Sequence, residues 1–186
     1  MSERLTAISK YLSFVLRHKP QAIGLKLDAN GWARVDELIT CAARDGRKLT
    51  PELIAAVVAT DPKQRYAFSE DGARIRANQG HSVDVDLQLK EEEPPAVLFH
   101  GTARASLEAI LVHGLKPMQR HHVHLSVDES TAYAVGRRYG EPVILRVDCA
   151  AMRADGHVFF RSENGVWLTD TVPAKFLAIA GDRTGS

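Results

Sequence analysis

Apolar side chains in the N-terminal half recur with the period of an amphipathic helix. Between positions 5 and 16 they stand three and four residues apart, which places them on one helix face. Pro20 disfavours helical geometry in the residue before it, so we expect this helix to end near Lys19. The next apolar series, over 35–42, predicts a second helix that ends near Gly46.

A third helix and a hairpin complete this half. Thr50-Pro51-Glu52 combines an N-cap, a first-turn proline and an early acid, which predicts a helix through Val58. Residues 66–69 and 73–76, joined by a turn at 70–72, predict a short β-hairpin. Helices closed by a hairpin in this order are typical of a winged-helix domain.

The C-terminal half changes to short apolar runs that are typical of strands. We expect strands at 97–100, 122–126, 143–147, 158–160, 166–168 and 176–179. Helices are expected over 104–113, ended by Gly114, and over 129–138, capped by Asp128. Strands outnumber helices without regular alternation, so the pattern predicts an α+β fold with mainly antiparallel strands.

A charged, proline-containing stretch separates the two halves. Residues 83–95 read VDVDLQLKEEEPP, and the glutamates and prolines suit a solvated connector. We therefore expect an N-terminal domain over 1–88, a linker over 89–95 and a C-terminal domain over 96–186.

Composition excludes several classes of protein. With 45% hydrophobic residues among 186, the chain is neither disordered nor fibrous. Lys and Arg number 24 against 23 Asp and Glu, so no global field attracts nucleic acid and any anion binding must be local. No apolar run approaches the roughly 20 residues of a membrane helix, and no signal peptide is recognisable, so we expect a cytoplasmic protein without a membrane partner.

Common cofactor motifs are also missing. Cys41 and Cys149 have no CxxC spacing, so we expect two buried thiols rather than a disulfide or a cysteine-ligated zinc. The sequence has no GxxxxGK[ST], GxGxxG, HExxH or GxSxG string, which removes the common nucleotide, metalloprotease and esterase signatures.

Arginine and histidine residues are the remaining candidates for chemistry. Arg17 and His18 end the first predicted helix, where the helix dipole alone would favour a cation. Arg65 begins the hairpin, where solvation alone would explain it.

A second group, RHHVH at 120–124, enters a predicted strand. Strand alternation puts His122, His124 and Ser126 on one face. A His-x-His pair on a strand can chelate zinc, but no acidic or cysteine ligand stands at a supporting spacing, so we expect no metal.

Together these segments resemble the NAD-dependent RNA 2′-phosphotransferases, the tRNA-splicing phosphotransferase family called KptA in bacteria. The most specific strings are IRANQGHS at 75–82 and HVHLS at 122–126. The likeness also covers RHKP at 17–20, GW at 31–32, RY at 65–66, LFHGT at 98–102, VGRR at 135–138 and NGVWLT at 164–169.

The resemblance implies a winged-helix N-terminal lobe that binds RNA and an ADP-ribosyltransferase-like C-terminal lobe that binds NAD. It also implies a two-step reaction: an RNA 2′-phosphate displaces nicotinamide from NAD, and the ADP-ribose O2″ then attacks that phosphate. The products are 2′-hydroxyl RNA, ADP-ribose 1″,2″-cyclic phosphate and nicotinamide. NAD is thus a co-substrate, and we expect a monomer whose partners are NAD and a 2′-phosphorylated RNA.

The family's site residues can be carried over by matching motifs. The implied catalytic set is Arg17, His18, Arg65 and Arg120. The implied NAD-binding set is His100, Gly101, Thr102 and Ser126. A 2′-phosphate carries about 1.5 to 2 negative charges near neutral pH, and guanidinium groups hold such oxygens in bidentate fashion.

Some residues leave questions open. The sequence assigns no role to Arg76, Asn78, Gln79 or His81 in IRANQGHS, which could shape a cleft, contact substrate or only make a turn. Tyr139 stands where the family often has His. No acid stands in NGVW at 164–167, where many ADP-ribosyltransferases carry a glutamate, and this argues against protein modification.

Two alternative functions remain open at this point. The chain could be an ADP-ribosyltransferase that caps a terminal phosphate of nucleic acid with the same site. It could also be a non-catalytic winged-helix nucleic-acid binder whose C-terminal lobe senses NAD. Product analysis distinguishes all three.

Overall fold

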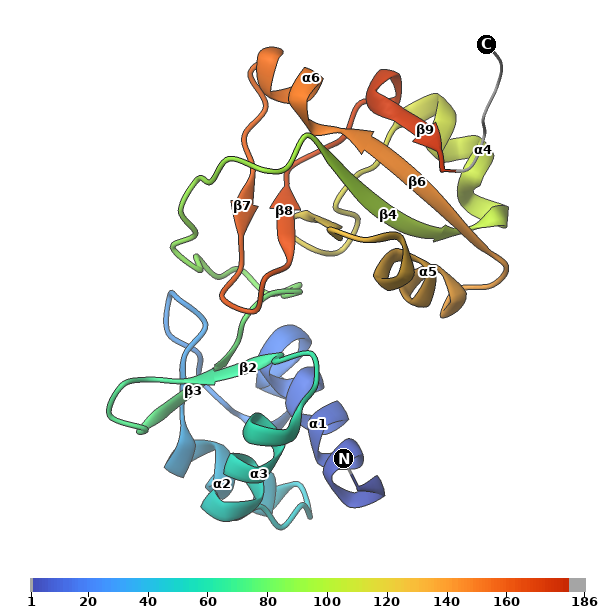
Figure 1. The fold of residues 1–186 in the computed structure, drawn as a ribbon. Coiled ribbons are helices and arrows are strands. Elements are labelled where there is room, and N and C mark those ends of the chain that lie inside the picture. The colour runs from blue at the N-terminus through green and yellow to red at the C-terminus, as the bar shows by residue number, and fades with distance from the viewer. Residues whose placement is uncertain (1, 181–186) are drawn as a thin grey trace. The chain divides into compact units, whose positions relative to one another are not determined.

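The computed structural model describes residues 2–180, and they fall into two compact units that divide between Gln88 and Leu89 (Figure 1). The predicted second domain extends to Ser186, and residues 181–186 lie outside the described residues. Each unit has its own apolar core, so each is described by itself.

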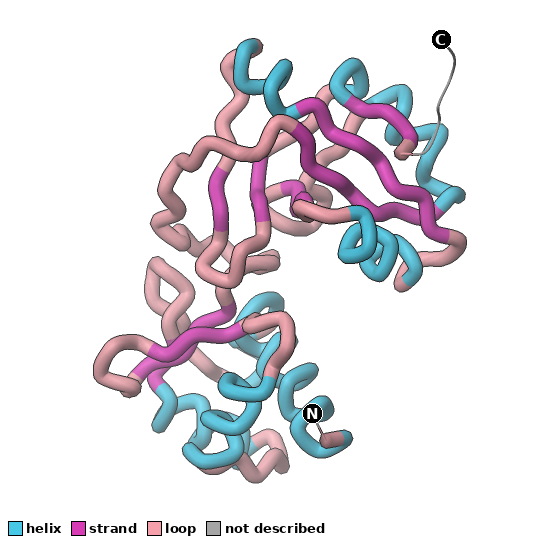
Figure 2. The backbone as a smooth tube through the Cα atoms, viewed as in Figure 1, coloured by secondary structure: helices cyan, strands magenta, loops and turns pink. Residues whose placement is uncertain are grey.

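The first unit combines helices with a small antiparallel sheet. Strands β1, β3 and β2 lie side by side in that order. Figure 2 shows the strands of both units in magenta and the helices in cyan. In chain order the elements are α1 (Glu3–Ser13), the π-helical turn η1 (Phe14–His18), the 3-10 helix η2 (Pro20–Ile23), β1 (Ala33–Arg34), α2 (Val35–Arg44), α3 (Pro51–Thr60), β2 (Tyr66–Phe68) and β3 (Arg74–Ala77).

The predicted helices and hairpin of this unit are confirmed. The Thr50 hydroxyl accepts the Leu53 N–H at 3.1 Å and caps α3 as expected. Strand β1 and the helix η2 were not predicted. Only Ala33 and Arg34 form β1, and they pair with Ile75 and Arg74, a partner that local periodicity cannot reveal.

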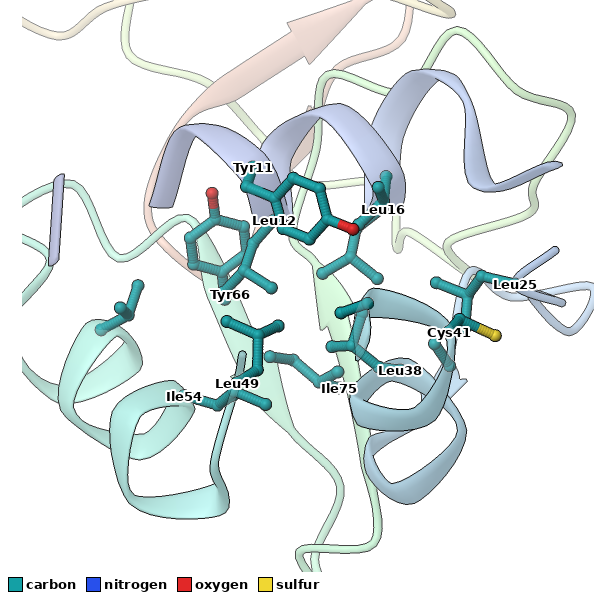
Figure 3. Packing of buried hydrophobic residues seen from close by; sticks show 14 of the residues in the cluster. Tyr11, Leu12, Leu16, Leu25, Leu38, Cys41, Leu49, Ile54, Tyr66 and Ile75 are labelled. Atoms are coloured by element: carbon teal, nitrogen blue, oxygen red, sulfur yellow. The ribbon is translucent and has the colours of Figure 1, made fainter. Parts of the chain in front are cut away.

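The core of the first unit gathers the apolar faces of α1, α2 and α3 against the sheet (Figure 3). Leu12, Leu16, Leu38, Ile54 and Ile75 are fully buried. Burial of each such side chain contributes about 1.5–3 kcal/mol to the stability of the fold. This cluster therefore holds the helices against the sheet.

The second unit is built on two antiparallel sheets, with strand orders β4-β6-β9 and β5-β8-β7 among the described residues. The prediction of an α+β fold with mainly antiparallel strands is confirmed. The elements are β4 (Val97–Ala103), α4 (Arg104–His113), β5 (Val123–Leu125), α5 (Glu129–Arg137), β6 (Pro142–Asp148), α6 (Cys149–Ala154), β7 (Phe160–Arg161), β8 (Trp167–Thr169), the 3-10 helix η3 (Ala174–Phe176) and β9 (Leu177–Ile179).

Local signals located most of these elements. Helix α4 has the predicted bounds, and Asp128 caps α5 by accepting the Thr131 N–H at 2.7 Å. The short helix α6 was missed, although Asp148 caps it through the Ala151 N–H at 3.0 Å. Its six residues are too few for an apolar period to be recognised.

The acidic stretch before β4 makes contacts within the second unit. The Glu92 N–H donates to the Phe159 carbonyl at 2.9 Å. The Glu92 carboxylate pairs with Arg161 at 2.8 Å, and Glu93 pairs with Arg153 at 2.9 Å. These side chains remain substantially exposed, so each pair contributes little to stability.

Both cysteines are buried thiols, as predicted. Burial raises the pKa of Cys149 to about 12, which keeps it protonated and unreactive near neutral pH. None of the helices within residues 2–180 combines the length and apolar character needed to cross a membrane.

Candidate active site

Arg17 and His18 are presented by an irregular helix end. After Ser13 the α-helix continues as the π-helical turn η1, and the Lys19 N–H donates to the Phe14 carbonyl five residues earlier at 2.9 Å. Such turns are rare and often occur at functional sites. The turn buries Val15 and Leu16 completely and leaves His18 exposed. The helix ends at His18, next to Lys19 as expected, but its final turn is π-helical rather than α-helical.

The segment Asn78–Ser82 holds this helix end. The Ser82 N–H donates to the Arg17 carbonyl at 2.9 Å, and the Ser82 hydroxyl lies 2.9 Å from His18 Nδ1. Gly80, at φ +87°, lies against the Arg17 guanidinium: a Cβ there would be 3.5 Å from Arg17 Cζ. Arg17 Nη1 also donates to the Ser13 hydroxyl at 3.2 Å. Arg17 and His18 are therefore fixed from two sides.

The buried carboxylate of Asp61 holds Arg65, so Arg65 is more than a solvated side chain. The Asp61 side chain is fully buried, and its oxygens accept from Arg65 Nη1 at 2.5 Å, the Arg65 N–H at 2.9 Å and the Lys63 N–H at 3.1 Å. The Arg65 side chain is 28% exposed, so part of the guanidinium faces solvent. A charged group held in this way is preorganised to bind an anion.

Arg17 and Arg65 both act on the Tyr66 hydroxyl. Burial raises the pKa of Tyr66, whereas the hydrogen bond with the Ser9 hydroxyl, 3.3 Å away, and the Arg17 and Arg65 charges lower it. The Tyr66 O–H donates to the Ser9 carbonyl at 2.5 Å. The Asp61 carboxylate, which pairs with Arg65, acts on the pKa of Tyr66 in the opposite direction to the two cations.

The IRANQGHS string has a structural role in this unit. The Asn78 amide donates to the Gln64 carbonyl at 2.7 Å, and its N–H donates to the Arg65 carbonyl at 2.8 Å. The Arg76 guanidinium stacks 4.4 Å above the Trp32 ring. Gln79 and His81 are buried. The string thus connects the backbone of Arg65 with that of Arg17.

Arg120 lies in the second unit and contacts the predicted His face. Arg120 Nη1 donates to His124 Nδ1 at 3.2 Å. The His124 carbonyl in turn accepts from His100 Nδ1 at 2.9 Å. Arg120, which precedes β5, is therefore connected through His124 in β5 to His100 in β4.

The bond to a carbonyl fixes the tautomer of His100. A carbonyl can only accept, so Nδ1 carries the hydrogen and Nε2 of the neutral ring is an acceptor. Burial lowers the pKa of His100, and the Arg120 charge lowers it further, against the opposing effect of the His124 carbonyl. His100 is therefore neutral at pH 7 and can accept a hydrogen bond from a hydroxyl.

The other predicted NAD-binding residues differ in their surroundings. Ser126 exchanges both backbone hydrogen bonds with Phe99, the residue before His100, at 2.8 Å. Thr102 is buried. Gly101 faces α5, and a Cβ there would overlap the Ala132 carbonyl oxygen. Close helix packing therefore requires a glycine at this position whether or not a ligand binds.

Strand alternation around β5 is as predicted. Val123 and Leu125 are buried, while His122, His124 and Ser126 are half-buried. His122 contacts the Phe160 ring edge-on at 5.7 Å. Within residues 2–180, no group of three or more His, Cys, Asp or Glu side chains is placed to hold a metal ion.

The structure adds residues that sequence reasoning missed. Arg17, His18 and Arg65 belong to the first unit, and in the second unit Arg120 is connected to His100 through His124. Asp61, Gly80 and Ser82 support the first group and were not predicted. The Asp-Pro turn after α3 was the available signal for Asp61, because such an Asp commonly binds nearby N–H groups.

Comparison with known proteins identifies the family. Residues 3–171 match the model described as "RNA 2'-phosphotransferase, Tpt1 / KptA family". The chain is 53% identical over 176 residues to a protein of Acaryochloris marina named "Probable RNA 2'-phosphotransferase", covering 95% of this chain and 97% of the relative. A protein of the same name from Pseudomonas fluorescens is 57% identical over 170 residues, covering 91% of this chain and 93% of the relative.

A third relative agrees with these two. The protein of that name from Hahella chejuensis is 52% identical over 179 residues and covers 96% of both chains. The match extends through both units and includes the segments that carry Arg17, His18, Arg65 and Arg120. This chain therefore belongs to the RNA 2′-phosphotransferase, Tpt1 / KptA family.

Proposed function

We propose that this chain removes a 2′-phosphate from RNA by transferring it to NAD. The observation that carries the proposal is that one unit holds Arg17, His18 and Arg65 through defined contacts with Gly80, Ser82 and Asp61 respectively. A dianionic phosphate ester suits such a group, because guanidinium N–H donors make strong charge-assisted bonds to phosphate oxygens. Membership of the family supports the same substrate.

The first proposed step is a substitution at the nicotinamide ribose. An oxygen of the RNA 2′-phosphate bonds to C1″, the bond from C1″ to the ring nitrogen breaks, and its electron pair neutralises the pyridinium. Nicotinamide leaves as a neutral molecule, so the step requires positioning more than a strong base. Arg17 and Arg65 are proposed to orient the phosphate.

The second proposed step is a transesterification at phosphorus. The ADP-ribose O2″ bonds to phosphorus and gives its proton to solvent water, while the bond from phosphorus to RNA O2′ breaks and O2′ gains a proton. His18 is the proposed donor of that proton, and the arginines stabilise charge on the phosphate oxygens. The products are RNA with a free 2′-hydroxyl and ADP-ribose 1″,2″-cyclic phosphate.

NAD is proposed to bind the second unit around His100 and Ser126. Neutral His100 offers Nε2 as an acceptor for a ribose hydroxyl. Arg120 remains the fourth proposed catalytic residue, and its guanidinium suits a phosphate group. Thr102 belongs to the same predicted set, and Gly101 is explained by helix packing alone.

We propose a winged-helix fold for the first unit and an ADP-ribosyltransferase-like fold for the second. The order of α1, β1, α2, α3, β2 and β3 supports the former, and the two antiparallel sheets are compatible with the latter. We retain as proposals the domain limits 1–88 and 96–186 with a connector over 89–95, and a cytoplasmic monomer that uses no metal.

The decisive experiment incubates the protein with NAD and an oligonucleotide that bears one internal 2′-phosphate. Mass analysis should find dephosphorylated RNA, nicotinamide and ADP-ribose cyclic phosphate. An oligonucleotide without the 2′-phosphate is the control and should release no nicotinamide. A stable ADP-ribose cap on a terminal phosphate would favour a capping transferase, and no nicotinamide release with either RNA would favour a non-catalytic binder.

A further inference from the structure

Ser82 is the residue of the first unit whose contacts combine most directly with the proposed chemistry. It lies 64 residues after His18 in the sequence, yet its hydroxyl is 2.9 Å from His18 Nδ1. Its N–H donates to the Arg17 carbonyl at 2.9 Å, and its hydroxyl also lies 3.5 Å from that carbonyl oxygen. One serine therefore contacts two consecutive members of the proposed catalytic set.

These contacts allow one consistent set of hydrogen-bond directions. A hydroxyl has one hydrogen, and a carbonyl oxygen can only accept. If the Ser82 hydrogen points to the Arg17 carbonyl, the Ser82 oxygen accepts from His18, and Nδ1 carries the proton. A protonated His18 then donates from Nε2 on the opposite side of the ring, where a departing oxygen can take the proton.

We infer that Ser82 is a positioning residue that fixes the ring orientation and the Nδ1–H form of His18 for proton donation in the second step. The inference rests on the proposed function, because it adds to the role given there to His18. Ser82 itself touches no reacting atom. The Ser82 N–H bond to Arg17 belongs to the backbone, so a side-chain substitution leaves it in place and isolates the hydroxyl.

The test compares Ser82→Ala with Ser82→Thr, which keeps a hydroxyl, in the full chain. Ser82 is exposed, so neither variant leaves a buried cavity. Thr40→Ala is the matched control, because it removes an exposed hydroxyl that donates to the Asp36 carbonyl at 3.0 Å, away from the proposed site. Nicotinamide release measures the first step, and decay of the ADP-ribosylated RNA measures the second.

We expect Ser82→Ala to slow the second step by about 3- to 10-fold, the effect of one ordinary hydrogen bond, and to leave the first step unchanged. Ser82→Thr and Thr40→Ala should match the unmodified protein. Adding Ser82→Ala to His18→Asn should cause no further loss, because the serine acts through the histidine. A second-step rate unaffected by Ser82→Ala, or a full further loss in the His18→Asn background, would overturn the inference.

A spectroscopic measurement separates this inference from the proposed function. The ¹⁵N shifts of the His18 ring report the tautomer without any substrate. They should indicate the Nδ1–H tautomer of His18 in the unmodified protein and a mixture of the Nδ1–H and Nε2–H tautomers in Ser82→Ala. If the unmodified protein releases no nicotinamide with the 2′-phosphorylated RNA, the proposed function fails, and these spectra decide the positioning role: a changed population supports it, and identical spectra overturn it.

Discussion

The Asp61 carboxylate and Arg65 are joined by two hydrogen bonds, one from the guanidinium at 2.5 Å and one from the backbone N–H at 2.9 Å. Asp61 is fully buried, whereas Arg65 is partly exposed. The buried Asp61 carboxylate therefore holds the partly exposed Arg65 side chain in place. Loss of the anchor would leave the Arg65 backbone and guanidinium less well defined.

Asp61→Asn should lower kcat/KM for the phosphorylated RNA by about 10- to 100-fold, the range seen when an outer partner of a functional side chain is lost. Asparagine keeps acceptor capacity for one N–H but loses the charge that orients Arg65. Asp36→Asn is the control, since it removes an exposed ion pair with Arg34 outside the proposed site. Equal kinetics for Asp61→Asn and the unmodified protein would contradict an anchoring role.

Gly101→Ala should destabilise the second unit rather than weaken NAD binding alone. The new Cβ would overlap the Ala132 carbonyl oxygen, so α5 must move away from β4. We expect a loss of about 3 kcal/mol in the free energy of unfolding, at the upper end for overpacking. Denaturant unfolding measures this loss.

Gly46→Ala provides the comparison for that measurement. Gly46 has φ +74° and no atom within 4 Å of the position that a methyl group would take, so its substitution tests backbone strain without a clash. We expect Gly46→Ala to lower the free energy of unfolding by about 1–2 kcal/mol. A Gly101→Ala protein as stable as the unmodified one would refute the packing explanation. The predicted role of Gly101 in NAD binding would then be the remaining explanation for this glycine.

Local chemistry made much of the fold predictable. The period of α1, the Thr50 cap of α3 and the Asp128 cap of α5 each depend on residues within one or two turns. Strand β1 depends instead on pairing between Ala33 and Ile75, which are distant in sequence. The π-helical turn η1 gives the same apolar spacing as an α-helix up to its last residues, so the sequence predicted its end but not its form.

The candidate site was predictable only in part for the same reason. The likeness to a family identified Arg17, His18, Arg65 and Arg120, but no local pattern indicated what holds them. Asn78 reaches the Gln64 carbonyl, and Ser82 reaches His18 across 64 residues. Such contacts depend on tertiary structure, and a single sequence contains no signal for them.

The stability of the second unit should fall as the pH is lowered from about 7. Burial lowers the pKa of His100 from its ordinary 6.5, so the unfolded chain binds a proton at a pH where the folded chain does not. Stability is therefore lost as the pH falls through 6.5 and continues to fall until the folded pKa is reached. Unfolding free energies measured between pH 7.5 and pH 5.5, both chosen as about one unit from the ordinary value, test this sign.

His100→Gln should flatten that pH dependence, because glutamine can still donate to the His124 carbonyl but does not titrate. His122 contributes in the same direction, since burial and His121 lower its pKa, so His122→Gln should flatten the remainder. An unchanged slope in the double variant would show that other groups govern the acid sensitivity. NMR titration of His100 provides a direct check on the direction of its shift.

His18 gives the most specific kinetic prediction, because its proposed role is confined to one of the two steps. The first step expels a neutral leaving group and needs no proton donor, whereas the second must protonate RNA O2′ as its bond to phosphorus breaks. His18→Ala and His18→Asn should therefore release nicotinamide at a rate close to that of the unmodified protein. The second step should slow by about 10²- to 10⁴-fold, the usual contribution of a general acid, so that ADP-ribosylated RNA accumulates.

Arg17→Ala is the informative comparison for that result. It removes a proposed phosphate ligand rather than a proton donor, so both steps should slow and no intermediate should accumulate. Quenched time courses with a labelled oligonucleotide distinguish the two patterns. Normal product formation by both His18 variants would remove the general-acid assignment, and it would leave the arginines to stabilise the departing oxygen, since their guanidinium groups remain charged across the accessible pH range.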